Sequence, residues 1–577
     1  MKKAVSITLS VLLTLFCLPL GARAAVSTGT VIDPDGSDGY SGDYVVIYNP
    51  SVSASDTAST GAMTGLIETE VGNKRPVCKG DPVVPYMIDV DPMLAELDRA
   101  HLAGLPETEE MPTKASFEVG DTHKFMIRNY SPDGLYMTFK VLAKGEHCYV
   151  WTPVSTNANV YPLDSIDPDY ARMAADMFDS KFDLMRESFG EHSNGAHGDG
   201  RLSILYYNIN DGWQPGQAYI GGYFSASDLY YNGLPILNID TYPGVIRPDA
   251  NGVMVSDISN TYSPTVHEYQ HLICYSRVGS ADTWIDECLS SAAEEICFPA
   301  SCVYRRIQTW THHDYSEHQD WDAPPCEVEY AAENSAENGY SLYDWSNGMT
   351  GGDMLVLYAQ VSLFAQYMYS RFGNTVFHRI IDNMGGSSPA NSFQSVCRAA
   401  TGVDPDELAQ NFRIALTANT SPYEYGGLYS FSMQEGYDPA AYHGVENLYE
   451  LLCPVVFTGA SCLIRGGGAI CIKPVGGVYY PPQDASPDLR YFGVTRSFDG
   501  PGYQLGDVDM NGGVNSADAL LALRYAMGLT ALTPGQLGLG DMDGDGSVTS
   551  SDALIIIRIS LGAVSKGEKH YVQIFRR

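Results

Sequence analysis

Short apolar runs between turn residues predict β-strands, and apolar residues spaced three or four apart predict amphipathic helices. A helix is expected over residues 167–189, where Asp167 can cap the first turn and Pro168 suits the first helical position. Two further helical stretches lie within 261–300 and 353–418. The predicted strands are 44–48, 125–127, 136–139, 148–151, 202–207, 236–239 and short runs within 450–500. This order of strands and helices predicts an α+β fold.

The first 24 residues predict export. Lys2 and Lys3 precede an apolar run from Ala4 to Leu20, and Ala22-Arg23-Ala24 is typical of a signal-peptide cleavage site. No later stretch has about 20 uninterrupted apolar residues, so no membrane insertion is expected after signal cleavage. The mature protein is therefore expected outside the cell.

Length and charge narrow the classes of partner. The chain has 577 residues, which predicts about two to four domains. Its 34 Lys and Arg against 69 Asp and Glu give a net charge of −35. Proteins that bind nucleic acid or anionic membranes present basic patches, so this charge argues against both kinds of partner.

One short motif predicts a catalytic zinc site. His267-Glu268-Tyr269-Gln270-His271 contains the pattern H-E-x-x-H. On a helix, two histidines four residues apart project from one face, so their imidazoles can bind the same Zn²⁺ ion. Glu268 would then lie beside the water that the ion activates and could take its proton.

A catalytic zinc site also needs a third protein ligand, and the acidic residues after the motif offer more than one. Glu287 follows His271 by 16 residues, and Glu294 lies two helical turns further on. One of these glutamates can bind the ion while the other supports the binding residues. Asp282, 11 residues after His271, is the competing ligand of an Asp-type site.

The surrounding residues resemble the Glu-type zinc peptidases, and among them the hyicolysin-like secreted bacterial metallopeptidases. The resemblance covers about residues 115–420 and rests on H-E-Y-Q-H, on the following W-I-D-E-x-L-S, and on Gly221-Gly222-Tyr223-Phe224. It implies a mixed, zincin-like catalytic domain with a helical H-E-x-x-H core. It also implies that His267, His271 and Glu287 bind zinc.

The same resemblance implies roles for two further residues. Glu268 matches the general base of these enzymes, and Tyr358 is the candidate that stabilises the oxyanion from the start of a later helix. The chain departs from the family pattern at one place, where Cys288 stands in the position that usually holds glycine.

Two segments near the C-terminus, residues 506–528 and 540–562, repeat at an offset of 34. Each has oxygen donors at the spacing of an EF-hand calcium loop, with Gly512 or Gly546 at the sharp turn and an apolar helix afterwards. The predicted calcium ligands are Asp507, Asp509, Asn511, Gly513, Asn515 and Asp518 in the first loop, and Asp541, Asp543, Asp545, Ser547, Thr549 and Asp552 in the second.

The repeat lacks the entering helices of an EF-hand pair and resembles a type I dockerin, the small all-α module that attaches secreted enzymes to the cohesins of a cellulosome scaffold. The resemblance covers about residues 503–565 and implies Ca²⁺ as cofactor and a cohesin as partner. Ser516-Ala517 and Ser550-Ser551 occupy the positions that help choose the cohesin and are alike, so either repeat could dock. The residues expected to form its small core are Leu520, Leu521, Leu523, Leu554, Ile556 and Ile557.

These observations predict a division of the chain and a function. The expected regions are a signal peptide at 1–24, a leader or propeptide-like region at 25–110, a zinc metallopeptidase-like domain at 111–440, a small β region and linker at 441–502, and a dockerin at 503–577. The expected protein is a secreted zinc endopeptidase of a cell-surface cellulosome that hydrolyses peptide bonds in protein substrates. Two alternatives remain: a non-catalytic assembly or adhesion subunit on a peptidase-like fold, and a plant-polysaccharide hydrolase, which would need a carboxylate pair in a sugar-binding cleft.

Overall fold

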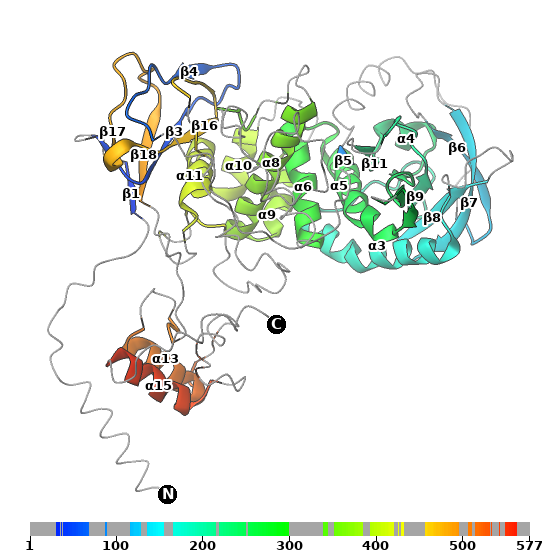
Figure 1. Cartoon of the computed structure of the whole chain (residues 1–577). Coiled ribbons are helices and arrows are strands. Elements are labelled where there is room, and N and C mark those ends of the chain that lie inside the picture. Colours follow the sequence, from blue (N-terminus) through cyan, green and yellow to red (C-terminus); the bar gives the residue numbers. More distant parts are fainter. Residues whose placement is uncertain are drawn as a thin grey trace, which may run out of the picture.

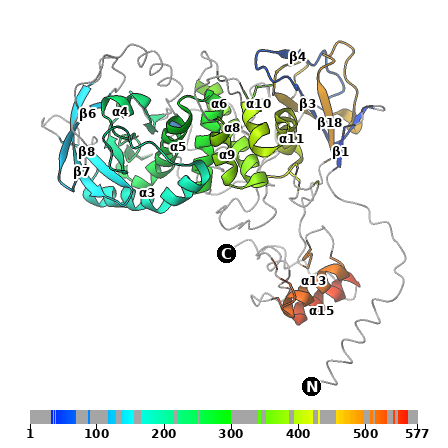
Figure 2. The same cartoon turned by 180° about the vertical axis from the view of Figure 1, so that it is seen from behind.

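Figures 1 and 2 show the computed structural model of the chain from opposite sides. With short gaps inside several stretches, it describes residues 31–67, 87–88, 116–127, 135–154, 165–298, 339–345, 351–384, 393–431, 456–495 and 506–561. The predicted signal peptide, residues 1–24, lies outside the described residues.

The largest sheet formed by the described residues has six strands in the order β11-β12-β9-β8-β7-β6. The central strands β8, β9 and β12 are parallel, whereas β6, β7 and β11 run antiparallel to their neighbours. The strands are β6 Thr122–Ile127, β7 Leu135–Lys144, β8 Cys148–Pro153, β9 Leu202–Tyr207, β11 Gly222–Tyr223 and β12 Ile236–Asp240. The strands predicted in this part of the chain are thus confirmed.

Two helices cover one face of this sheet. α3 (Pro168–Phe189) packs against β7 and β8, and α5 (Tyr262–Val278) packs against α3, β11 and β12 (Figure 1). Asp167 caps α3 as predicted, because its carboxylate accepts hydrogen bonds from two amides of the first turn. The opposite face of the sheet carries an aromatic cluster that includes Phe125, Phe139 and Trp151.

Further helices extend away from the sheet beyond α5, as Figures 1 and 2 both show. α6 (Thr283–Cys297) packs against α5 on one side and α8 (Gly351–Phe372) on the other. α9 Thr375–Met384, α10 Phe393–Thr401 and α11 Pro405–Ala418 follow. The helical stretches predicted within 261–300 and 353–418 are therefore confirmed. Shorter elements are α4 Ala226–Tyr231, η1 Ile258–Thr261, η5 Val475–Gly477, and the pairs of β5 Met87–Ile88 with β10 Tyr219–Ile220 and of β13 Ile246–Pro248 with β14 Met254–Ser256.

A second sheet joins early and late parts of the chain. β3 (Tyr44–Tyr48) lies between β16 (Ala469–Ile472) and β18 (Arg490–Thr495), and β1 (Val31–Asp33) pairs with the other edge of β18. All five residues of β3 are buried. The sheet packs on α11, where Tyr48 donates a hydrogen bond to an Asp406 carboxylate oxygen at 3.2 Å. Two smaller antiparallel pairs accompany it, β4 Thr57–Ser59 with β15 Leu463–Arg465 and β2 Tyr40–Ser41 with β17 Val478–Tyr479.

This sheet crosses the division predicted from the sequence. Residues 25–110 are predicted as a separate leader and 441–502 as a separate β region, whereas the structure places strands from both segments in one sheet. The local pattern of each segment indicates strands but not their partners. Tyr44 pairs with Val494, and pairing at that separation leaves no signal in a local pattern.

The repeat near the C-terminus forms two capped helices, α13 (Ser516–Ala526) and α15 (Ser550–Ser560). Each begins with the same capping box, Asn515 with Asp518 and Thr549 with Asp552. The buried apolar residues between them are Val508, Ala519, Ala522, Met542, Val548, Ala553 and Ile556.

The predicted core of this small unit is partly wrong. Ile556 is buried, and Leu521, Leu523 and Ile557 pack at its edge. Leu520 and Leu554 are instead exposed, at 44% and 48%. The small residues Ala519 and Ala553 face inward in their place, because two short helices packed closely together leave room only for small side chains at their contact.

Candidate metal centre

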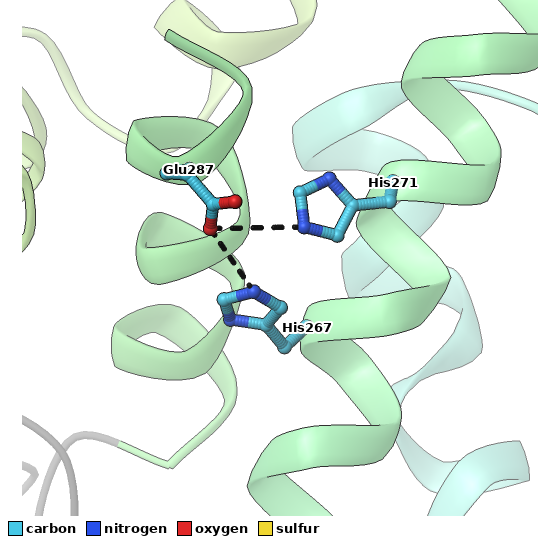
Figure 3. A group of neighbouring side chains, drawn as sticks. All are labelled: His267, His271 and Glu287. Carbon is cyan, nitrogen blue, oxygen red and sulfur yellow. Dashed lines mark ion pairs between the residues drawn. The ribbon is translucent and has the colours of Figure 1, made fainter. Parts of the chain in front are cut away.

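The two histidines of the H-E-x-x-H motif lie on one face of α5, as their spacing predicts. His267 and His271 are 1% and 2% exposed, and both rings face α6 (Figure 3). α5 is buried from Pro264 to Cys274, because it lies between the sheet and α6. Packing of α5 between these two elements therefore positions both imidazoles.

Glu287 of α6 completes the group. Its Oε2 atom lies 3.5 Å from Nε2 of His267 and 3.9 Å from Nε2 of His271 (Figure 3). Ligand atoms about 2.1 Å from a tetrahedral zinc ion lie about 3.4 Å apart, so these separations suit a shared ion. Two imidazoles and one carboxylate are also the donor set of a catalytic zinc site with one open position. The three residues therefore fit zinc.

The positions of the acidic residues around the histidines favour Glu287 over Asp282 as the third ligand. Asp282 precedes the first residue of α6, and the group that could hold a metal ion among the described residues contains Glu287 and not Asp282. Glu294 lies behind His267, where its Oε1 is 2.6 Å from Nδ1. An ionised carboxylate accepts only, so Nδ1 of His267 is the donor and Nε2 is left to act as a ligand.

A second carboxylate, which the sequence analysis did not assign a role, lies beside the other histidine. Asp286 Oδ1 lies 3.3 Å from Nδ1 of His271. Each histidine thus has Glu287 near Nε2 and a different acidic side chain near Nδ1. Glu294 is held in turn by Ser263, whose hydroxyl donates a hydrogen bond to Glu294 Oε2 at 2.6 Å.

Glu268 is 1% exposed and is positioned by the edge of the large sheet. The amide of Phe224, just after β11, donates a hydrogen bond to Glu268 Oε2 at 2.8 Å. Gly222 permits this approach, because a Cβ atom there would lie 3.3 Å from Glu268 Cγ and 2.9 Å from the Asn238 carbonyl oxygen. Gly222, within the Gly221-Gly222-Tyr223-Phe224 segment, is the one feature of the sequence that could have indicated this close contact.

Tyr358 lies on α8 and is 2% exposed. Its ring packs edge-on against Trp345, with centroids 5.0 Å apart. Its role at the oxyanion stays a prediction.

Cys288 follows the predicted third ligand inside a continuous helix, so its replacement of glycine does not interrupt α6. Burial raises the pKa of this thiol well above its usual value, and nearby Glu295 raises it further. Cys288 is therefore a protonated, packed side chain at neutral pH and not a thiolate that competes for the ion.

Three of the predicted calcium ligands in the first loop lie close together. Carboxylate oxygens of Asp507, Asp509 and Asp518 lie within 4.8 Å of one another. Asp518 accepts hydrogen bonds from the amides of Asp509 and Asn515, both at 2.8 Å. Burial, with a further contribution from the Asp509 charge, raises the pKa of Asp518 to about 6. Such a group of carboxylates fits Ca²⁺, whose ligands are oxygen atoms.

The second loop is described at its end only. Asp552 accepts from the amides of Met542 and Thr549 at 2.8 and 2.7 Å, which repeats the arrangement of Asp518. Burial alone would raise the pKa of Asp552, but these hydrogen bonds outweigh burial and lower it. The predicted ligands outside the described residues are Asn511, Gly513, Asp541, Asp543, Asp545 and Ser547.

Comparisons with known proteins found one family model and one relative. Residues 505–559 match the family model of the dockerin type I domain. The chain is 30% identical over 319 residues to the neutral metalloprotease ShpI of Staphylococcus hyicus, a match that covers 52% of this chain and 64% of that protein. The chain thus spans less than two thirds of the curated relative's length.

The two motifs found in the sequence therefore belong to separate parts of one chain. The chain carries a type I dockerin domain at residues 505–559 and is similar over 319 residues to a neutral metalloprotease of Staphylococcus hyicus.

Proposed function

We propose that this protein is a secreted zinc endopeptidase that is anchored to a cellulosome scaffold by a calcium-dependent dockerin–cohesin interaction. The observation that carries the proposal is the buried group of His267, His271 and Glu287, with Glu268 one residue from the first histidine. Similarity to a neutral metalloprotease supports the peptidase activity, and the dockerin match supports attachment.

Zinc held by His267, His271 and Glu287 would supply a Lewis acid that polarises the peptide carbonyl and acidifies the attacking water. Glu268 would accept a proton from that water through its carboxylate, which the Phe224 amide holds in place. Glu294 would orient the His267 imidazole, and the Asp286 carboxylate lies near the other imidazole. Tyr358 is proposed to donate to the oxyanion.

The proposed location and partners rest on the signal-peptide pattern near the N-terminus and on the dockerin near the C-terminus. The signal-peptide pattern at residues 1–24 supports export, and the dockerin supports a place on the cell-surface scaffold beside other secreted enzymes. Among the helices that the structure describes, none is both long and apolar enough to cross a bilayer. The proposed partners are a cohesin and a protein or peptide substrate.

Two variants test the proposed activity. Glu268→Gln should keep zinc, since Glu268 is not a ligand, and should lower the rate of casein hydrolysis by about 10²–10⁴. Glu287→Ala should lose zinc and activity together, whereas Asp282→Ala should keep both. Bound metal is measured by elemental analysis of the purified protein. A parent protein that binds zinc but hydrolyses no protein substrate would favour the non-catalytic subunit instead.

A further inference from the structure

The amide that positions Glu268 belongs to a very short strand. β11 consists of Gly222 and Tyr223, and its ladder pairs these two residues with Ile239 and Asn238 of β12. Phe224, the donor to Glu268, follows directly. A two-residue ladder at the edge of a sheet is a weak support, because strands at edges open most readily. The position of the Phe224 amide therefore depends on what else holds Tyr223.

Tyr223 is held by its hydroxyl on the opposite face of the sheet. The hydroxyl oxygens of Tyr223 and Tyr207 lie 2.7 Å apart, and both side chains are buried, at 4% and 1% exposure. The Tyr207 hydroxyl also lies 3.2 Å from Asn238 Oδ1, to which it can donate, and Tyr223 can then donate to Tyr207. We call this pair of tyrosines the tyrosine clasp.

The tyrosine clasp is anchored in a buried polar chain. Asn238, at 0% exposure, donates from Nδ2 to Asp228 Oδ2 at 3.0 Å. Asp228 also accepts from Asn232 Nδ2 at 3.0 Å, and Asn232 Oδ1 accepts from the amide of Met126 on β6. The chain of hydrogen bonds therefore links the edge strand to the far strand of the same sheet. Such buried chains fix one geometry, because breaking any member leaves a buried polar group unsatisfied.

The clasp lies across the sheet from the metal centre. Side chains alternate along a strand, so Tyr223 points to one face while Gly222 and Phe224 belong to the face that meets α5. Tyr223 and Tyr207 pack in the aromatic cluster with Phe139 and Trp151, whereas Phe224 packs in the core with α5. The tyrosine hydroxyls therefore act on the site only through the backbone of residues 222–224.

We propose that Tyr223, held by Tyr207, is a positioning residue for catalysis, because it fixes the backbone amide that orients Glu268. This inference rests on the proposed peptidase function. It assigns a catalytic consequence to two hydroxyls that touch neither the ion nor the substrate. Loss of either hydroxyl should let the Phe224 amide move, and a misplaced general base lowers the rate of the chemical step.

The test compares Tyr223→Phe, Tyr207→Phe and the double variant in the full chain. Each single variant should lower kcat for casein hydrolysis roughly tenfold, with KM and zinc content unchanged, since one charge-assisted hydrogen bond is disturbed. The double variant should lose no more than Tyr207→Phe alone, because that variant already removes the hydrogen bond between the two tyrosines, together with the one to Asn238. Tyr149→Phe is the matched control: Tyr149 is buried in neighbouring β8, and its hydroxyl donates to Asp199 at 2.6 Å, away from Glu268.

Two further measurements distinguish a role of Tyr223 in positioning Glu268 from a general loss of stability. The first measurement uses Glu268→Asp, because the shorter aspartate side chain no longer reaches the Phe224 amide. When Tyr223→Phe is added to this variant, kcat should change less than about twofold relative to Glu268→Asp alone. Hydrogen exchange of a peptide that spans residues 219–226 should speed up in Tyr223→Phe and not in Tyr149→Phe.

The outcomes distinguish this inference from the proposed function. An active parent whose kcat and Phe224 exchange are unaffected by Tyr223→Phe would overturn the inference and leave the peptidase assignment intact. A parent with bound zinc but no peptidase activity would overturn both the function and the catalytic role of the clasp. Equal losses of kcat in Tyr149→Phe and Tyr223→Phe would also overturn it, since the effect would then be one of stability.

Discussion

At the scale of single residues, the metal centre depends on carboxylates that do not bind the ion. His267 presents Nε2 to Glu287 because its Nδ1 donates to Glu294. Without that acceptor the ring could rotate, and a less basic imidazole binds zinc more weakly. The separation of Glu287 and Glu294 by two helical turns is what places one carboxylate at each ring nitrogen.

Glu294→Ala should therefore weaken zinc binding by about 10- to 100-fold without abolishing it. The loss arises from the orientation and basicity of His267, so Glu294→Gln, which keeps a hydrogen-bond acceptor, should recover part of the affinity. Competition with a zinc-binding dye measures both. The prediction would be contradicted if Glu294→Ala kept the parent affinity for zinc while Asp286→Ala lost zinc. The carboxylate that matters for binding would then be the one beside His271.

The sequence predicted the residues of the centre better than their surroundings. A helix spaces His267 and His271 by four residues, so their convergence follows from local geometry alone. Glu287 could be chosen over Asp282 only by resemblance, because its position depends on how α6 packs on α5. The Phe224 amide carries no side-chain signature and could not be predicted as a partner of Glu268, although Gly222 marks the close approach.

At the scale of elements, long helices and central strands were predictable, and two-residue strands were not. α3 has apolar residues at helical spacing, a cap and a proline at its start, so several local signals agree. β10 and β11 each have only two residues, which is too short for an alternating pattern to be recognised in the sequence. The error at Leu520 and Leu554 has a related cause, because a pattern with apolar residues on several faces of a helix does not show which face is buried.

The two calcium loops should control the folding of the helices that follow them. Asp507, Asp509 and Asp518 bring like charges together, and this repulsion opposes folding until a cation neutralises it. A segment of residues 503–565 should gain helical circular dichroism on addition of Ca²⁺ and lose it with a chelator. An Asp507→Ala/Asp541→Ala variant is the control and should stay insensitive. Identical spectra of the parent segment with and without calcium would contradict this.

At the scale of the whole molecule, the early strands belong to the folded body. β3 lies in the middle of the second sheet and buries five side chains, each worth about 1.5–3 kcal/mol when fully buried. That contribution is comparable to the net stability of a typical domain, about 5–15 kcal/mol. We therefore expect removal of the whole predicted leader, residues 25–110, to destabilise the folded body.

A chain that begins at residue 111 should accordingly fail to give a stable soluble fold, whereas one that begins at residue 25 should melt cooperatively. Removal of β1 and β3 would strip β18 of both its neighbours and expose the apolar face that packs on α11. A chain that ends at residue 502 is the control of similar size and should keep the parent melting temperature for the main transition. Thermal unfolding, followed by circular dichroism, tests this prediction. A stable fold of the chain that begins at residue 111 would show that residues 25–110 are dispensable.

The place of β18 in the second sheet also has a mechanical consequence. If the dockerin is fixed to a scaffold, a pull on the substrate side reaches the folded body through β18, which is the last described strand before the dockerin. β18 is antiparallel to β1 on one side and β3 on the other, so tension along it loads both ladders in shear rather than opening one pair at a time. Hydrogen bonds loaded together resist force far better than bonds broken singly. For the proposed anchored protein, we therefore expect β18 to resist unfolding when the chain is pulled from its C-terminal side.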